Sequence, residues 1–210
     1  MANAREILSR MKSVQDTRKI TNAMYLISST KLKKSKKLLE ETEPYFYSLQ
    51  DLIRRILRHM PDVEHFYFNP RKEIKEEDRI KGLIVITGDK GLAGAYNHNV
   101  LKMAQEWMEQ SKNHRLYVVG ELGRHYFEAR HIQVEEQFHY TVQNPTMHRA
   151  RLISSTILED YEEGRLDEVW IIYTQMINSM QMEAEMTALL PLKREDFSNI
   201  VIPANIIQEE

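Results

Sequence analysis

The feature that most constrains this chain is a stretch of 55 residues, 5–59, that contains no glycine and a single proline, Pro44. Good helix formers dominate it, and at about 1.5 Å per residue such a helix would be roughly 80 Å long, longer than a small domain is wide. Because proline lacks the amide proton that a helix needs, we expect a kink or an interruption near Glu43. The stretch predicts one long helix, part of which packs against something outside its own domain.

An apolar seam runs along this predicted helix. In its second half the seam residues alternate four and three positions apart, the heptad spacing of coiled coils. A similar but more polar stripe occupies the first half. The seam predicts that a second helix packs against this one. The seam residues are Ile7, Met11, Val14, Thr17, Thr21 and Met24, then Leu38, Thr42, Tyr45, Leu49, Leu52, Ile56 and His59.

Charge is distributed unevenly along the chain. Residues 1–37 contain ten bases and two acids, which is about +8, so the remainder of a chain with net charge -2 carries about -10. A basic arm on an acidic body indicates an acidic partner for the arm, since ten bases are more than a solvated helix face needs. The bases are Arg5, Arg10, Lys12, Arg18, Lys19, Lys31, Lys33, Lys34, Lys36 and Lys37.

The rest of the chain alternates strand and helix patterns. Buried-type strands are expected at 82–87, 115–119 and 169–175, a weak edge strand at 134–137, and a last strand at 182–190 that runs antiparallel because its connection is short. Helices are expected at 97–110, 121–129 and 146–161. This order predicts a three-layer α/β sandwich with a mostly parallel sheet. We divide the chain into a shaft helix (1–60), a linker (61–79), an α/β foot domain (80–192) and a C-terminal tail (193–210).

No catalytic, cofactor or metal site is predicted. The loop Gly88-Asp-Lys-Gly91-Leu-Ala-Gly94 follows a strand and precedes a helix, where anions bind, but its spacing matches neither the dinucleotide fingerprint nor a P-loop. We interpret its glycines as a tight turn. The eight histidines lack metal-ligand spacing, no Gly-x-Ser-x-Gly motif is present, and there is no cysteine. We therefore expect a non-catalytic protein.

Interaction remains, and protein is favoured over nucleic acid as the partner. The basic arm has one aromatic residue, Tyr25, so it lacks the stacking platforms of nucleic-acid binders. The acidic body would repel phosphate, and the bases share their helix with an apolar seam. No apolar run approaches the ~20 residues of a membrane span, so we expect no transmembrane segment.

Three ordered motifs resemble one family. Arg5 to Met24, REILSRMKSVQDTRKITNAM, followed by YLISSTKL, resembles the opening of the F-type ATP synthase gamma subunit, and ITGDKGLAGAYN, ending at Asn97, resembles that family's T-S-D-R-G-L-C-G-x-x-N signature. The third is Tyr161 to Asp167, with Ile177 to Met180 and Leu189 to Leu192 after it. Together they cover nearly the whole chain. Asn22, where the family usually has Lys, and Ala93-Gly94-Ala95, where Cys-Gly-Gly is common, are mild departures.

The resemblance implies the central stalk of a proton-translocating rotary ATP synthase, in which a coiled coil of two terminal helices turns inside a hexamer of alpha and beta subunits. It implies contacts with alpha, beta, epsilon and the membrane ring of c subunits, and a peripheral place on the cytoplasmic face of the bacterial plasma membrane, or on the equivalent organellar membrane. By motif and charge, the partner interface is expected at Arg10, Lys12, Val14, Thr17, Arg18, Lys19, Thr21, Met24, Lys31, Lys33 and Lys34. Ser13, Ile20 and Ala23 match the same motif.

One departure leaves an alternative open. The family continues into a long C-terminal helix, whereas this sequence ends at Glu210. We therefore keep a second hypothesis, a truncated, non-rotating gamma-like interaction module.

Overall fold

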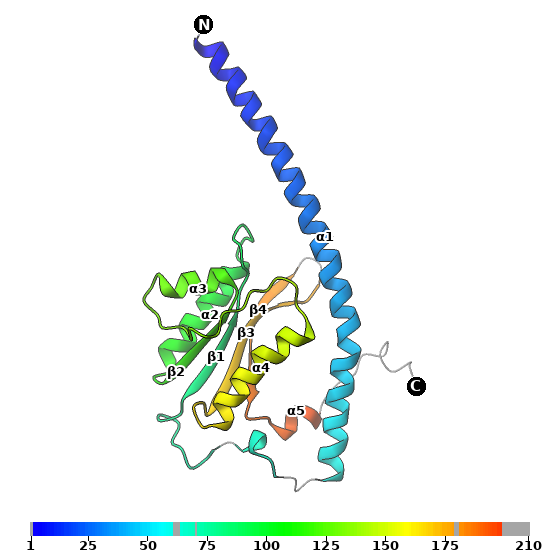
Figure 1. The fold of residues 1–210 in the computed structure, drawn as a ribbon, viewed down its shortest axis with the longest axis vertical. Helices are drawn as coiled ribbons and strands as arrows, with labels where there is room; N and C mark the ends of the chain where they lie inside the picture. The colour runs from blue at the N-terminus through cyan, green and yellow to red at the C-terminus, as the bar shows by residue number, and fades with distance from the viewer. Residues whose placement is uncertain (1, 61–63, 70, 179–180, 199–210) are drawn as a thin grey trace. The chain divides into compact units, whose positions relative to one another are not determined.

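A computed structural model describes residues 2–60, 64–69, 71–178 and 181–198. The chain divides near residue 61 into two compact units, the first containing the N-terminal helix and the second the α/β region up to Asp196. Figure 1 shows the elements of each unit. Parts of the predicted linker (61–63 and 70), of the third motif (179–180) and of the tail (199–210) lie outside the described residues.

The first unit is built on α1, a single α-helix from Ala2 to His59. The prediction of a long helix is confirmed. Of the kink or interruption expected near Glu43, the interruption is wrong, because the helix runs through Pro44. A proline removes one backbone donor, and the turns on either side keep theirs. The Thr42 hydroxyl, which donates to the Leu38 carbonyl at 2.7 Å, and the Ser48 hydroxyl, which donates to the Pro44 carbonyl at 2.8 Å, add contacts in those turns.

The second unit centres on a four-stranded sheet in the order β2-β1-β3-β4. Its central strands β1 (Lys81–Ile86) and β3 (Glu168–Met176) are parallel to each other, and β2 (His114–Val119) is parallel to β1. The last strand, β4 (Met182–Leu190), returns antiparallel along β3. The sheet is thus mostly parallel, with an antiparallel strand at the predicted place.

Helices cover both faces of the sheet (Figure 1). Leu83 and Val85 of β1 point to one face, where they pack with α2 (Tyr96–Gln110) and α3 (Glu121–Glu128). Ile84 points to the other face, towards α4 (Met147–Glu162). Alternate residues of one strand therefore feed two apolar cores, as expected for a buried strand. The predicted three-layer α/β fold is confirmed.

The weak edge strand predicted at 134–137 is wrong. This segment has no strand, and its Glu135 amide makes one bond, to the Leu116 carbonyl at 2.9 Å, before the chain turns. The apolar residues that suggested a strand are Val134 and Phe138. Each is buried singly, one in each core, and neither pairs with a neighbouring strand. Two further short elements are a 3-10 turn, η1 (Phe66–Phe68), and a helix, α5 (Arg194–Ser198).

Candidate interaction surface on the long helix

Exposed apolar side chains are the main feature of α1. Monomeric proteins rarely leave large continuous apolar surfaces in water, so a helix of this kind is typical of a surface that a partner covers. Seventeen large apolar residues of the helix are exposed: Ile7, Leu8, Met11, Val14, Ile20, Met24, Tyr25, Leu26, Ile27, Leu32, Leu38, Leu39, Tyr45, Phe46, Leu49, Leu52 and Ile56. The apolar seam expected from the sequence is present on α1, and its side chains are exposed.

The polar middle of the seam is better suited to packing than its sequence suggests. The Thr17 hydroxyl donates to the Ser13 carbonyl at 2.9 Å, and the Thr21 hydroxyl donates to the Thr17 carbonyl at 2.9 Å. A hydroxyl that already has an acceptor on its own helix needs no partner when it is buried. Thr17 and Thr21 can therefore act as small, close-packing residues between Val14 and Met24.

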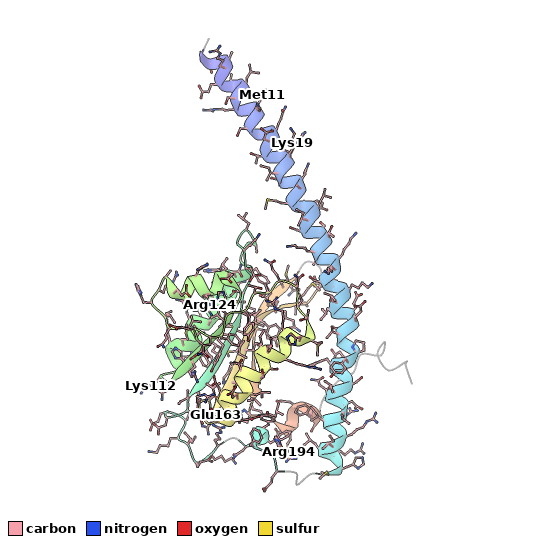
Figure 2. The ribbon with its side chains drawn as sticks, viewed as in Figure 1. Met11, Lys19, Lys112, Arg124, Glu163 and Arg194 are labelled. Atoms are coloured by element: carbon pink, nitrogen blue, oxygen red, sulfur yellow. The ribbon has the colours of Figure 1, made fainter. Side chains whose placement is uncertain are left out.

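A basic stripe runs along a different side of the same helix. Residues seven apart recur on nearly the same side, at about 3.6 residues per turn. Arg5, Lys12 and Lys19 follow this spacing, as does Lys33 beyond the exposed Leu26, which takes the intervening position. Val14 and Thr21 lie on roughly the opposite side. Figure 2 labels Met11 and Lys19 on the helix.

Most of this basic charge is not neutralised within the helix. Arg10 pairs with Glu6 at 2.7 Å and Lys19 with Asp16 at 3.5 Å, both on the exposed surface, where such pairs contribute little. Among the described residues no ion pair is formed by Arg5, Lys12, Arg18, Lys31, Lys33 or Lys34. The stripe therefore keeps its positive charge for an external acidic group.

The residues predicted for the partner interface all lie on α1, and all are exposed. They are not gathered on one face: Val14, Thr17 and Thr21 belong to the seam, whereas Lys12, Lys19 and Lys33 belong to the basic stripe. A helix whose predicted contacts run around its circumference suits a partner that surrounds it. The assignment of these side chains as contacts stays a prediction.

The glycine-containing loop between β1 and α2 is held by its own side chains. The Gly88 amide donates to Oδ1 of buried Asn97 at 2.7 Å, and Oδ1 of Asp89 accepts from the amides of Glu121 and Val142 at 3.3 and 3.2 Å. These bonds join the loop to α2, to the start of α3 and to the segment at Val142. This geometry agrees with the reading of the loop as a tight turn. It also presents Leu92, which is 94% exposed, a feature that the sequence pattern did not indicate.

Two open cavities of about 350 and 580 Å³ in the second unit are lined mainly by charged, polar and aromatic side chains. No group of His, Cys, Asp or Glu that could hold a metal occurs in the part of the chain that the structure describes. Within that same part, no helix has the length and apolarity that crossing a membrane requires. The long helix is the strongest candidate for a functional surface.

A basic, seamed helix joined to a three-layer α/β unit defines a class of protein that works by assembly with other subunits. Comparison with known proteins identifies the family. The model of the family described as ATP synthase matches residues 3–209. The ATP synthase gamma chain of Acetivibrio thermocellus is 45% identical over 92% of this chain, and that of Caldanaerobacter subterraneus subsp. tengcongensis is 41% identical over 98%.

The chain therefore belongs to the ATP synthase gamma family. It matches 65% and 69% of the length of those two relatives, about two thirds of each. A solved structure of the central stalk and c-ring of the Tetrahymena thermophila mitochondrial ATP synthase aligns over 76% of this chain and 72% of its own, with a TM-score of 0.46 and 19% sequence identity.

Proposed function

We propose that this chain is part of the central stalk of an F-type ATP synthase, in which α1 is one strand of a rotating shaft and the α/β unit is its foot. Rotation driven by ion flow would change the state of catalytic sites that lie on beta subunits, and the chain itself performs no chemistry. The observation that carries the proposal is α1: a continuous helix of 58 residues with an exposed apolar seam and a separate basic stripe, in which Lys19 pairs with Asp16 on the exposed surface and Arg5, Lys12 and Lys33 form no ion pair among the described residues.

Each side of α1 fits a different partner. The seam, with its self-bonded threonines, has the spacing and the small side chains that a second helix needs for close packing. The basic stripe suits acidic loops of the alpha and beta subunits that would surround the shaft. The foot would contact epsilon and the ring of c subunits, placing the chain at the cytoplasmic face of the membrane without crossing it.

The test is assembly of the rotor subunit carrying charge reversals in the basic stripe. We expect Lys12→Glu together with Lys19→Glu to reduce co-purification with alpha and beta by roughly tenfold or more, because each exposed cation that faces an acidic group would become a repulsion. The amount of alpha and beta retained on the tagged subunit, measured against the unmodified chain, gives the result.

A matched control places the same charge change on the foot. Lys102 and Lys112 lie at and just beyond α2, and Lys102→Glu with Lys112→Glu alters net charge equally while leaving α1 intact. We expect this variant to assemble normally. An unmodified chain that fails to bind alpha and beta would contradict the proposal and favour a gamma-like module without a rotary role. Normal assembly of the Lys12 and Lys19 variant would remove the basic stripe from the interface.

A further inference from the structure

The chain segments that lead into and out of the α/β unit are bonded to each other. On the incoming side, η1 contains Tyr67 and Phe68; on the outgoing side, Leu192 and Arg194 follow β4. The Leu192 amide donates to the Tyr67 carbonyl at 2.7 Å, and the Arg194 guanidinium lies 5.3 Å from the centre of the Phe68 ring. Figure 2 labels Arg194. These segments are 125 residues apart in sequence, from Tyr67 to Leu192, and the fold joins them at one place.

The incoming side is also fastened to the body of the unit. The Tyr67 hydroxyl donates to the Glu162 carboxylate at 2.7 Å, at the end of α4. Partial burial and, to a smaller extent, the bond to Glu162 raise the pKa of Tyr67 to about 12.

Arg71 makes the second and stronger attachment. Its side chain is largely buried and donates to the Tyr161 and Leu166 carbonyls at 2.5 and 2.7 Å and to the Asp167 carboxylate at 2.8 Å. The guanidinium also lies over the Tyr161 ring at 4.4 Å. One side chain thus joins the incoming segment to the end of α4 and to the turn that begins β3. Only the planar fork of an arginine can satisfy these acceptors together.

We propose that Tyr67 and Arg71, with the Phe68, Leu192 and Arg194 contacts, form a clasp that makes the foot follow the shaft during rotation, and that Tyr67 and Arg71 are positioning residues for coupling. This inference rests on the proposed function. In a rotor, force passes between foot and shaft through the segments that connect them. The incoming segment is bonded to the outgoing one and to the α4–β3 corner, so force that enters the foot at the incoming segment reaches the sheet without first stretching a loose connection.

The clasp predicts a loss of coupling that exceeds the loss of catalysis. In the complete complex, we expect Arg71→Ala to leave ATP hydrolysis nearly unchanged while ATP-driven ion pumping, per ATP hydrolysed, falls by roughly three- to tenfold. Arg71→Lys keeps the positive charge facing Asp167 but loses the planar guanidinium fork. Its ratio of ion pumping to ATP hydrolysis should lie between those of the unmodified chain and Arg71→Ala. Tyr67→Phe removes only the bond to Glu162 and should cause a smaller fall. Ion pumping into vesicles and hydrolysis are measured on the same preparation.

A control variant and the ratio of ion pumping to ATP hydrolysis distinguish a loss of coupling from a loss of folding stability. Arg130 lies over Tyr126 at 3.6 Å, but it joins residues only four apart, so Arg130→Ala removes a similar contact outside the clasp and should leave the ratio unchanged. A merely destabilised foot would lower assembly, hydrolysis and pumping together at a constant ratio, and that result would overturn the inference.

The outcomes also distinguish the two proposals. If the unmodified chain does not assemble with the catalytic subunits, the proposed function fails. If it assembles and pumps, but Arg71→Lys and Tyr67→Phe are both fully coupled, only the clasp is wrong. These two mild variants decide the matter even where Arg71→Ala does not fold.

Discussion

Gly120 stands at a position where even a methyl group would collide with backbone. Its φ is +102°, and a Cβ built there would lie 2.3 Å from the Thr87 carbonyl oxygen and 2.7 Å from the Thr87 hydroxyl. That hydroxyl accepts from the Gly123 amide at 3.0 Å, so the ends of β1 and β2 and the start of α3 meet within a few atoms. The sequence placed a strand-to-helix boundary here correctly. It could not indicate the close approach, which depends on the parallel pairing of two strands more than 25 residues apart.

We expect Gly120→Ala to lower the free energy of unfolding by roughly 2–4 kcal/mol, because the left-handed backbone and the clash with Thr87 both disfavour a side chain. Chemical denaturation of the whole chain measures the loss. Gly91→Ala is the matched control, since its Cβ would meet only Leu122, at 3.9 Å, and a change within about 0.5 kcal/mol is expected. Equal stabilities of the two variants would show that Gly120 and Thr87 do not approach each other so closely that a methyl group would clash.

At the scale of elements, the periodic spacing of apolar residues predicted the helices and the buried strands, but it could not predict residues that are buried singly. The 3.6-residue pattern indicated α1, α2, α3 and α4, and continuous apolar runs indicated β1 and β3, because buried faces impose a period on the sequence. Val134 and Phe138 are buried singly, one in each core, so their spacing resembled a strand that the fold does not contain.

The exposed seam and the basic stripe of α1 were predictable for a similar reason, since apolar and charged residues recur along one helix. The clasp was not. Tyr67 and Arg71 contact residues 95 and 96 positions away, and a turn followed by charged residues predicts only a linker.

Pro44 makes a local prediction about α1. A proline in a helix interior costs about 3 kcal/mol relative to alanine, yet the helix is continuous. We therefore expect Pro44→Ala to slow hydrogen exchange of the amides around residues 41–48 by roughly a hundredfold, provided that they exchange by local opening. Mass spectrometry of peptides from α1 provides the measurement. Ser35→Ala, at another exposed position of the helix, should change exchange only a few-fold. Unaltered exchange in the proline variant would mean that this turn is not helical in solution.

For the whole molecule, the separation of charge matters more than its total. The chain carries about +8 in residues 1–37 and about -10 in the remainder, which a net charge of -2 conceals. A basic arm steers encounter with an acidic partner at long range, and the same steering makes the encounter sensitive to salt, because the screening length is only about 10 Å at 0.1 M ionic strength.

We accordingly expect the association rate of the rotor subunit with the alpha and beta subunits to fall steeply as ionic strength rises. The variant with Lys12→Glu and Lys19→Glu should bind more slowly at low salt and show a flatter dependence, while the Lys102 and Lys112 variant keeps the unmodified slope. Stopped-flow mixing at several salt concentrations tests all three. An association rate that does not change with ionic strength would show that the basic stripe does not guide assembly.

The exposed seam of α1 also has a consequence for how a cell makes this subunit. The helix is translated before the α/β unit, so its apolar side chains emerge from the ribosome first and meet water, or each other, until another chain covers them. Free copies would cluster by these exposed apolar surfaces. On the proposed function, the tolerable supply of unassembled subunit would be low, and the exposed seam of this one helix would require synthesis in step with the partner subunits.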